Sequence, residues 1–408
     1  MLIIVFCIVS LLVFSCSHRK LNSSSEGACY IIELDENKEE YMPYSSVFKN
    51  MQTIIIETNN DCLIGRINEL QVYNDYIYIL DMLIAKSLFV FDKEGHFVRK
   101  IGNLGRGPGE YIQIEDFSID KEKGIIYLLD FGQRVHKYRL DGTYLNTITV
   151  QIQRSTVYFI QFYNNRLYAS VRSWEPSPDD FLLVEIDPDN GKILSQHLPS
   201  TYNKGWSKSS TTGHSFFISR LNNPPRYTHL FMDTIVSLGE EITPYIELKS
   251  KHLVTNEDFE NLPEEKLTTF TPFQVLQGTS KIWDVNSFLE NDDIIFFRCK
   301  SGFMSGNRSS FSVLFHKKNG SVKIANRMFN DFLFKRIDDD EKSIMYVFDG
   351  KFAFSDSKGA YEILNSQLIE SFKESIRNNE LVPDLDKLDE LLNLEEDANP
   401  VIFYYEYK

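Results

Sequence analysis

Hydrophobic and polar positions alternate in short runs from about Ile67 onward, and turn-forming residues separate these runs. The clearest unit contains four runs, over residues 67–72, 76–81, 87–92 and 97–101. Alternation with a period of two, in runs rich in Ile, Val, Tyr and Phe, is typical of β-strands. The sequence therefore predicts a unit of four antiparallel strands.

The next stretch of chain repeats this unit. Asp81 recurs as Asp130 and Asp92 recurs as Asp141 at the same spacing, and a similar apolar run precedes each of the first pair. A period of ~40–50 residues with four strands per repeat is typical of the blades of a β-propeller rather than of a helical solenoid.

Glycines in turns give an independent estimate of the number of blades. The turn between the last two strands of a blade needs a residue that tolerates positive φ, usually Gly after a polar residue. Six positions fit this pattern: Gly95, Gly142, Gly191, Gly239, Gly320 and Gly359. The longest interval, between the fourth and fifth of these, contains a polar, helix-compatible stretch at 255–267, which predicts an insertion at about 250–280 within one blade.

The C-terminal part predicts a helix and a last strand. Leu385, Leu388, Leu391 and Leu392 recur at helical spacing among acidic residues, within a helical segment at about 366–394. Residues 401–407 then form a β-rich run. In a propeller such a strand completes a blade together with an N-terminal strand, for which 31–34 and 53–57 are the candidates. We therefore expect an all-β, six-bladed propeller of four-stranded antiparallel blades, closed by its terminal strands.

The N-terminus has the features of an export signal. An almost unbroken apolar run at 2–14 is too short to span a bilayer and matches the core of a secretory signal. The residues that follow, Val-Phe-Ser-Cys16, resemble the lipobox of bacterial lipoproteins. This resemblance implies a signal peptide at 1–16, lipidation of Cys16, a polar tether at 17–28 and a single propeller at 29–408. The alternative is a cleaved secretory signal in which the cysteine is incidental.

The destination follows from the same resemblance. The basic run His18-Arg19-Lys20 lacks the acidic signal that some Gram-negative lipoproteins use to reach the outer surface. We therefore expect an exported protein, anchored by lipid in the envelope of a Gram-negative bacterium, at the outer membrane and facing the periplasm.

Charge and cysteine content limit the partners. The chain has 43 Lys and Arg against 58 Asp and Glu, a formal charge of −15, which repels nucleic acid and anionic lipid. We expect no nucleic-acid partner and membrane contact only through the lipid. Apart from Cys16, the mature chain keeps Cys29, Cys62 and Cys299, which lack metal-ligand spacing. Either Cys29 pairs with Cys62 or the thiols are buried and unpaired.

The most specific segment is the glycine-rich stretch at 102–111, Gly-Asn-Leu-Gly-Arg-Gly-Pro-Gly-Glu-Tyr, between the first two units. Its glycines predict a rigid, sharp turn from one blade to the next, with Arg106 and Glu110 near enough to pair. The alternative is an anion-binding nest of backbone amides beside Arg106. Arg106, Glu110 and Tyr111 are therefore candidate binding residues. A phosphate-binding loop is excluded because strands follow and no Gly-Lys-Ser/Thr ending exists.

This stretch resembles the junction of six-bladed propeller lipoproteins that are numerous in gut Gram-negative bacteria. Those proteins are distantly similar to NHL-repeat and TolB-like propellers, and most have no assigned function. Four further matches follow in the family's order: Glu57 after an apolar strand, Leu63-Ile64-Gly65, Asp233-Thr234-Ile235 and Asn399-Pro400-Val401. The resemblance covers nearly the whole mature chain and implies the fold without implying an activity.

Two tryptophans are further binding candidates. Trp174 and Trp206 lie in polar, loop-like stretches, where an exposed indole could stack on a sugar ring or on a partner side chain. The alternative is that they cover blade edges. Trp283, in a strand-like run, is expected in the core. The acidic run at 338–341 lacks the spaced ligands of a calcium loop and is expected to be a solvated charge run.

No catalytic set, metal-ligand set or cofactor motif is recognisable, and the sequence alone assigns no catalytic triad. This favours a non-enzymatic module that binds a protein, peptide or glycan partner. One alternative is a metal-dependent, lactonase- or lyase-like enzyme, with Ca²⁺ as the candidate metal, whose ligands would come from several blades at the central channel. Another is a structural subunit of an envelope complex.

Overall fold

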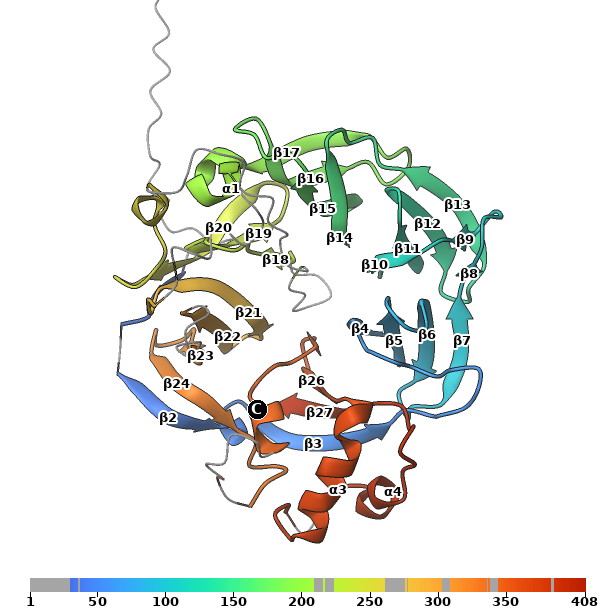
Figure 1. Ribbon diagram of the computed structural model, residues 1–408, viewed down its shortest axis with the longest axis vertical. Coiled ribbons are helices and arrows are strands. Elements are labelled where there is room, and N and C mark those ends of the chain that lie inside the picture. The colour runs from blue at the N-terminus through green and yellow to red at the C-terminus, as the bar shows by residue number, and fades with distance from the viewer. Residues whose placement is uncertain are drawn as a thin grey trace, which may run out of the picture.

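The strands of the computed structural model form six blades around a central axis (Figure 1). The structure describes residues 30–35, 37–208, 216, 224–260, 276, 278–302, 309–335, 337, 344–382 and 385–408. The expected signal peptide, Cys16, the tether, Cys29 and the acidic run at 338–341 lie outside these residues.

The first three blades are simple antiparallel meanders of four strands, as the sequence predicts. Blade 1 contains β4 (Glu69–Tyr73), β5 (Tyr76–Asp81), β6 (Ser87–Asp92) and β7 (Phe97–Ile101); blade 2 contains β10 (Ile114–Asp120), β11 (Ile125–Asp130), β12 (Arg134–Arg139) and β13 (Tyr144–Thr149); blade 3 contains β14 (Ser155–Tyr163), β15 (Arg166–Ser173), β16 (Phe181–Ile186) and β17 (Ile193–Pro199). The first strand of each blade lies nearest the axis (Figure 1).

The other three blades each include a strand from the N-terminal segment. Blade 4 contains β18 (Arg226–Tyr227), β19 (Thr234–Leu238), β20 (Ile242–Lys249) and β1 (Tyr30–Glu33); blade 5 contains β21 (Ile282–Glu290), β22 (Ile294–Ser301), β23 (Ser309–His316), β24 (Val322–Phe329) and β2 (Lys38–Pro43); blade 6 contains β25 (Phe354–Ser355), β26 (Gly359–Leu364), β27 (Val401–Tyr407) and β3 (Phe48–Ile55). Strands β1 and β2 pair in parallel, whereas β3 pairs antiparallel. The N-terminal segment therefore runs along the outer edges of three consecutive blades.

The ring closes where β27 pairs with β3, with Phe403 opposite Thr53. The prediction of a terminal strand pair is confirmed, and 53–57 overlaps the true partner. The other candidate, 31–34, is wrong, because Tyr30–Glu33 pairs with β20 instead. Aromatic packing supports the closure, since the rings of Phe48 and Tyr407 stack with centroids 5.5 Å apart.

The glycine markers predict the number of blades correctly, but one of them has a different role. Four of the turns join the third and fourth strands of their blades, and Gly239 joins β19 to β20. Gly359 instead begins β26, after the turn that follows β25. The last turn of blade 6 does not exist in the chain, because its two outer strands come from opposite chain ends.

The insertion lies between blades and not within one. It connects β20 to β21, so the prediction of an insertion inside a blade is wrong. Its described part contains a 3₁₀ helix, η3 (Asn256–Phe259), which begins at a capping box formed by Thr255 and Asp258. Residues 261–275 lie outside the described part.

The C-terminal helical segment packs on the outside of blade 6 (Figure 1). It contains η5 (Ser366–Leu368), α3 (Ile369–Arg377) and α4 (Leu388–Leu392). Phe372 of α3 contacts Phe348 and Phe403 in the core, with ring centroids 5.9 and 5.8 Å apart. The remaining short elements are η1 (Tyr44–Ser46), β8 (Asn103–Leu104), β9 (Glu110–Tyr111), η2 (Ser200–Tyr202), α1 (Lys204–Lys208) and η4 (Ile344–Val347). Among the described residues, no helix is long and apolar enough to cross a membrane.

The buried hydrophobic side chains form clusters that extend from one blade to the next. One such cluster joins Tyr78 and Val90 of blade 1 to Phe117 and Leu128 of blade 2. Apolar burial at about 25 cal/mol per Å² therefore holds the blades together as a ring. Cys62 and Cys299 are free and buried, which agrees with the alternative of unpaired thiols.

Candidate binding face

The strands of each blade alternate in direction, so successive turns lie at opposite ends of the blade. The middle turn lies at the same end as the connection to the next blade, and the first turn lies at the other end. In blades 1–3, we call the end that carries the middle turns and the connections the connection face. It consists of the turns at 82–86, 131–133 and 174–180 and the connections at 56–68, 102–113 and 150–154.

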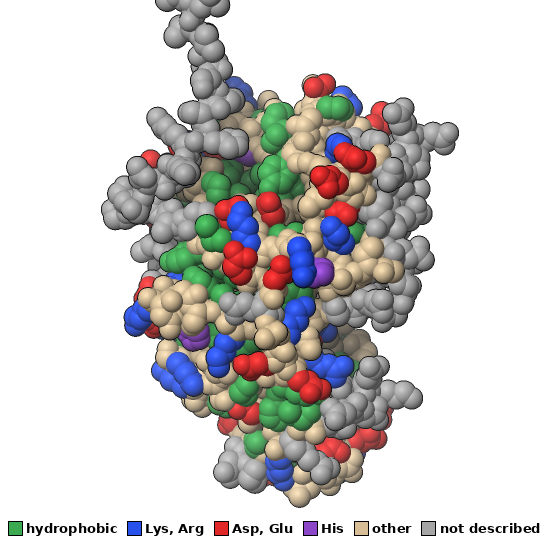
Figure 2. Space-filling model, turned by 90° about the vertical axis from the view of Figure 1, so that its left-hand side faces the viewer, with side chains coloured by type: hydrophobic (Ala, Val, Ile, Leu, Met, Phe, Trp, Pro, Cys, Tyr) green, Lys and Arg blue, Asp and Glu red, His purple; other side chains and the backbone are tan. Residues whose placement is uncertain are grey.

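Exposed apolar side chains gather on the connection face. They are Leu63, Leu83, Ile84, Leu104, Ile112, Phe131 and Trp174. These are seven of the twelve large hydrophobic side chains that are exposed among the described residues. The three most exposed are Ile84 at 65%, Phe131 at 61% and Trp174 at 58%. The side of the ring in Figure 2 carries acidic and basic side chains interspersed with hydrophobic ones over its coloured surface.

In blade 1 a buried carboxylate holds this face in place. Asp81 ends β5 and is fully buried. Its Oδ2 accepts the amides of Gly65 and Arg66 at 2.7 and 3.1 Å, and its Oδ1 accepts the amide of Ile84 at 2.8 Å. One side chain thus ties the connection to the middle turn. The Ile84 side chain lies against Gly65, where a Cβ would be 2.5 Å from it.

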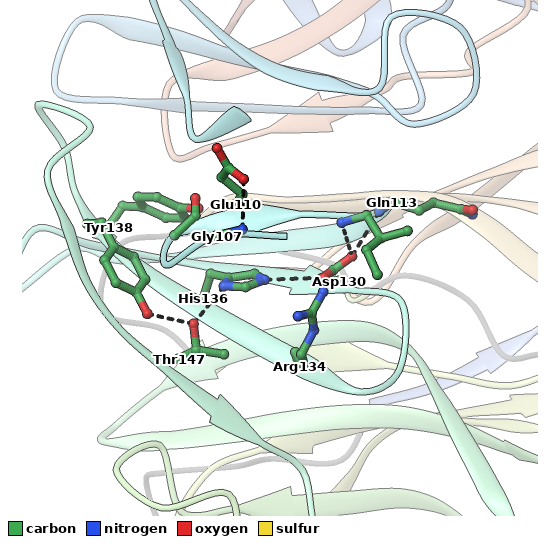
Figure 3. Close-up of polar contacts among 11 residues, drawn as sticks. Gly107, Glu110, Gln113, Asp130, Arg134, His136, Tyr138 and Thr147 are labelled. Atoms are coloured by element: carbon green, nitrogen blue, oxygen red, sulfur yellow. Dashed lines mark hydrogen bonds and ion pairs between the residues drawn. The ribbon is translucent and has the colours of Figure 1, made fainter. Parts of the chain in front are cut away.

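In blade 2, Asp130 ties the corresponding connection to β12 (Figure 3). Its Oδ1 accepts the amides of Ile112 and Gln113 at 3.0 and 2.9 Å, and its Oδ2 pairs with Arg134 and lies 3.3 Å from Nε2 of His136. Burial alone raises the pKa of Asp130, but the His136, Gln113 and Arg134 contacts outweigh it, so the pKa is lowered. The recurrence of Asp81 as Asp130 therefore reflects a repeated anchor for the connections.

A buried polar chain continues from Asp130 across blade 2 (Figure 3). Nδ1 of His136 lies 2.7 Å from the Thr147 hydroxyl, which lies 2.9 Å from the Tyr144 hydroxyl. The His136 side chain is only 2% exposed, and these contacts join β11, β12 and β13. We interpret the chain as a satisfied network that fixes the outer strands beneath the connection face.

The glycine-rich connection is a rigid turn that uses its own polar groups. Glu110 accepts the amide of Gly107 at 2.7 Å, and the amide of Gly105 donates to the Tyr111 carbonyl at 2.9 Å. The expected pairing of Arg106 with Glu110 is wrong, because the ion pairs between described residues do not include it. Gly105 has no Cβ, which leaves room for the Glu110 carboxylate to turn into the loop. Arg106 is exposed on the connection face.

Two of the five candidate residues are buried. Tyr111 is 1% exposed between blades 1 and 2, where burial raises its pKa to about 12. Trp206 is also 1% exposed, donates to the Leu230 carbonyl at 2.7 Å and stacks on Tyr202 with centroids 5.2 Å apart. The expected exposed indole is therefore wrong for Trp206, because the short helix α1 places it in a buried hydrophobic cluster although its neighbours in sequence are polar. Trp283, expected in the core, is partly buried and donates to the Gly302 carbonyl at 3.0 Å.

Trp174 is exposed as the sequence indicates. Its ring nitrogen donates to the Thr156 hydroxyl at 2.9 Å, and the Arg172 guanidinium lies 5.3 Å from the ring centroid. Sequence reasoning missed Ile84 and Phe131. Their signal was present, because each follows a strand-ending Asp within a turn, where an apolar residue has no structural reason to be exposed.

Two carboxyl groups come together on neighbouring inner strands. Glu69 of β4 and Asp116 of β10 occupy equivalent positions, opposite Leu80 and Leu129. Burial raises the pKa of both groups, and each carboxyl acts on the other. Oδ2 of Asp116 accepts the Ile160 amide at 2.6 Å. In the described part of the chain, no three His, Cys, Asp or Glu side chains lie close enough to hold a metal ion.

The ring of six blades defines a β-propeller, and its connection face carries exposed apolar side chains. The chain belongs to the family of the domain of unknown function DUF4934, whose model matches residues 29–406. No curated protein matches the chain.

Two solved structures support the fold. One, from Bacteroides fragilis NCTC 9343, is named "Putative exported protein"; it is 19% identical, with a TM-score of 0.68, and the similarity covers 93% of this chain and 99% of that one. The other, a member of the DUF4221 family from Bacteroides vulgatus ATCC 8482, is 10% identical, with a TM-score of 0.51, and covers 89% of this chain and 97% of that one. This chain is therefore similar over its length to propellers from Gram-negative gut bacteria.

Proposed function

We propose that this propeller is an exported, lipid-anchored binding module that docks a protein or peptide partner on its connection face. The observation that carries the proposal is the set of seven exposed apolar side chains on that face. Soluble monomers rarely expose contiguous apolar patches of more than a few hundred Å², and those that do use them for binding.

The chemistry of this face suits a protein partner better than a sugar. Five of the seven side chains are leucine or isoleucine, which offer contact area but no hydrogen bonds. Phe131 and Trp174 add the aromatic anchors that often dominate protein interfaces. Arg106 lies at the same face, and Arg is also enriched at such interfaces.

The anchoring of the turns supports tight binding. Asp81 holds a turn and a connection, and Asp130 holds a connection, with short hydrogen bonds, so little conformational freedom remains to be lost there on binding. A lipid on Cys16 and the tether at 17–28 would keep the module at the membrane. We place it at the outer membrane, facing the periplasm.

Site-specific crosslinking in cells tests this proposal. A photo-crosslinking amino acid at Phe131 or Ile84 is expected to give one discrete adduct, because these side chains would lie in the interface. The matched controls are Leu145 and Leu194, which are 38% and 49% exposed on the outer strands β13 and β17. They are expected to give none.

The adduct must also depend on the chemistry of the face. With the crosslinker at Trp174, Ile84→Ser together with Phe131→Ser should reduce the adduct about tenfold or more, because hot-spot truncations cost ≥ 2 kcal/mol. Equal adducts from Leu194 and Phe131, or an adduct that survives the double substitution, would overturn the proposal.

A further inference from the structure

A groove with a cavity volume of about 740 Å³, lined by charged and aromatic side chains, lies at the end of the ring opposite the connection face, where blades 6 and 1 meet. Its walls come from the β4–β5 turn, the β6–β7 turn, the β10–β11 turn and the β25–β26 turn. The outer strand β3 and the loop before α4 complete the lining. Grooves of ≈ 300–1,000 Å³ are the usual size of small-molecule sites.

Lys121 reaches this groove from blade 2 without a charged partner. It is half-buried, and the ion pairs and hydrogen bonds of the described residues include none for its ammonium. Its Nζ lies 5.9 Å from the ring centroid of Tyr73. Burial lowers the pKa of Lys121, and the charge of Asp356 only partly opposes this. A bound anion would compensate the buried charge.

Lys123, in the same turn, differs in this respect. Its Nζ donates to Oδ1 of Asn165 at 2.8 Å, and it is not part of the groove lining. The two lysines of one turn therefore offer a test and a matched control.

Three tyrosines give the groove an aromatic wall. Tyr361 and Tyr404 lie with ring centroids 4.8 Å apart, and Tyr73 lines the groove from blade 1. The Tyr73 hydroxyl donates to the Lys121 carbonyl at 2.6 Å, which fixes the turn that carries the lysine. Tyr404 is partly exposed and lines the groove, whereas Tyr361 is only 8% exposed.

We propose that this groove binds an acidic saccharide, a sugar ring that carries a carboxylate. The carboxylate pairs with Lys121, and the apolar face of the sugar ring packs on the partly exposed ring of Tyr404. Sugar hydroxyls donate to the carboxylates of Asp75 and Asp356, which line the same groove.

Charge balance favours this ligand over a polyphosphate. Four lysines and four acids line the groove: Lys93, Lys121, Lys358, Lys387, Asp75, Glu94, Asp356 and Asp386. Because the four lysines and four carboxylates balance, the lining offers no net positive charge to attract a multiply charged phosphate. A singly charged ligand with many hydroxyls can use both the ammonium groups and the carboxylates. A neutral sugar would leave Lys121 uncompensated.

Calorimetry on the full mature chain tests this inference. The probes are glucuronic acid, galacturonic acid and their short oligomers, with glucose, galactose and inorganic phosphate for comparison. We expect the acidic sugars to bind at least about tenfold more tightly than the neutral sugars, because only they offer a charged hydrogen-bond partner to the Lys121 ammonium. Equal binding of neutral sugars, preferred binding of phosphate, or no binding would each overturn the proposal.

Three variants locate the site. Lys121→Met and Tyr404→Ala should each weaken binding about tenfold, whereas Lys123→Met should leave it unchanged. Melting temperatures near that of the parent would show that the first two variants are folded. An equal loss for Lys123→Met would contradict the assignment. Phe131→Ser lies on the opposite face and should not affect the sugar, so failure of this inference and failure of the protein-docking proposal are distinguishable.

Discussion

At the scale of single residues, the fold is constrained most by the need of buried polar groups for hydrogen-bond partners. Glu362 of β26 is 2% exposed between blades 5 and 6. Its Oε1 accepts the Tyr44 hydroxyl at 2.8 Å and its Oε2 accepts the Tyr405 hydroxyl at 3.2 Å. Burial is the largest effect on this carboxyl and raises its pKa to about 8. The group is therefore mostly protonated in the folded protein at neutral pH.

This predicts a pH dependence of stability. Below the ordinary pKa of 4.5, Glu362 is protonated in both states, so its contribution is fully present. From pH 4.5 to about 8 the unfolded chain releases the proton while the folded chain keeps it. The free energy of unfolding should therefore fall by at most about 1.4 kcal/mol per pH unit from this group.

Glu362→Gln replaces the carboxyl group with a neutral amide of nearly the same shape, which cannot ionise. The variant should therefore gain stability relative to the parent as the pH rises from 5 to 8, as measured by chemical denaturation at several pH values. Glu374→Gln, an exposed site on α3, is the control and should run parallel to the parent. A constant difference between Glu362→Gln and the parent would show that the carboxyl is not buried in its neutral form.

No sequence pattern could have found this cluster. Tyr44 and Glu362 are 318 positions apart, and each lies in a run that resembles many others. The same holds for Trp206, whose polar neighbours in sequence suggested exposure although the fold buries it. Local sequence predicts the tendency of a residue to be buried, whereas its partners depend on the closure of the ring.

At the scale of elements, the turns between outer strands also join neighbouring blades. The Gly95 carbonyl accepts the Glu57 amide at 2.8 Å, and the Gly191 carbonyl accepts the Gln151 amide at 2.8 Å. At both glycines φ is positive, and an added Cβ would overlap a backbone carbonyl of the preceding blade. Glycine is required there for conformation and for space, which is why the glycine spacing predicted the blades.

Gly191→Ala should consequently destabilise the protein more than Gly132→Ala. Both glycines have positive φ, at 75° and 80°, but nothing lies within 4 Å of a Cβ at Gly132. The control measures the conformational cost alone, on the order of 1 kcal/mol, and Gly191→Ala should exceed it by about 2 kcal/mol because two blades must separate. If both variants lose the same free energy of unfolding in chemical denaturation, the turn at Gly191 does not pack tightly against blade 2.

The sequence misplaced the elements that do not follow the repeating pattern of the blades. Gly359 follows a polar turn like the other markers, but its Cβ would overlap Tyr405 of β27, so close packing explains the glycine there. The insertion at 250–280 has no repeat partner, and only the structure shows that it connects two blades.

At the scale of the whole molecule, the N-terminal segment has two separate roles. Strands β1 and β2 extend the outer edges of blades 4 and 5 in parallel, whereas β3 completes blade 6 and closes the ring. The candidate sites also need the whole ring, because the connection face uses three blades and the groove uses blades 6, 1 and 2. The sequence predicted the glycine-rich connection and the exposure of Trp174. It did not predict that turns far apart in the chain come together at the connection face and at the groove.

The two roles predict different results for two deletions. Removal of residues 1–43 takes away β1 and β2 but keeps β3 paired with β27, so the protein should melt at a lower temperature in one cooperative transition. Removal of residues 401–408 takes away β27, which lies between β26 and β3, and exposes two strand edges in a ring that is no longer closed. That variant should lose cooperative melting in calorimetry, whereas removal of residues 1–28 should change little. If the chain without β27 melts like the parent, closure by the terminal strands is not what holds the ring together.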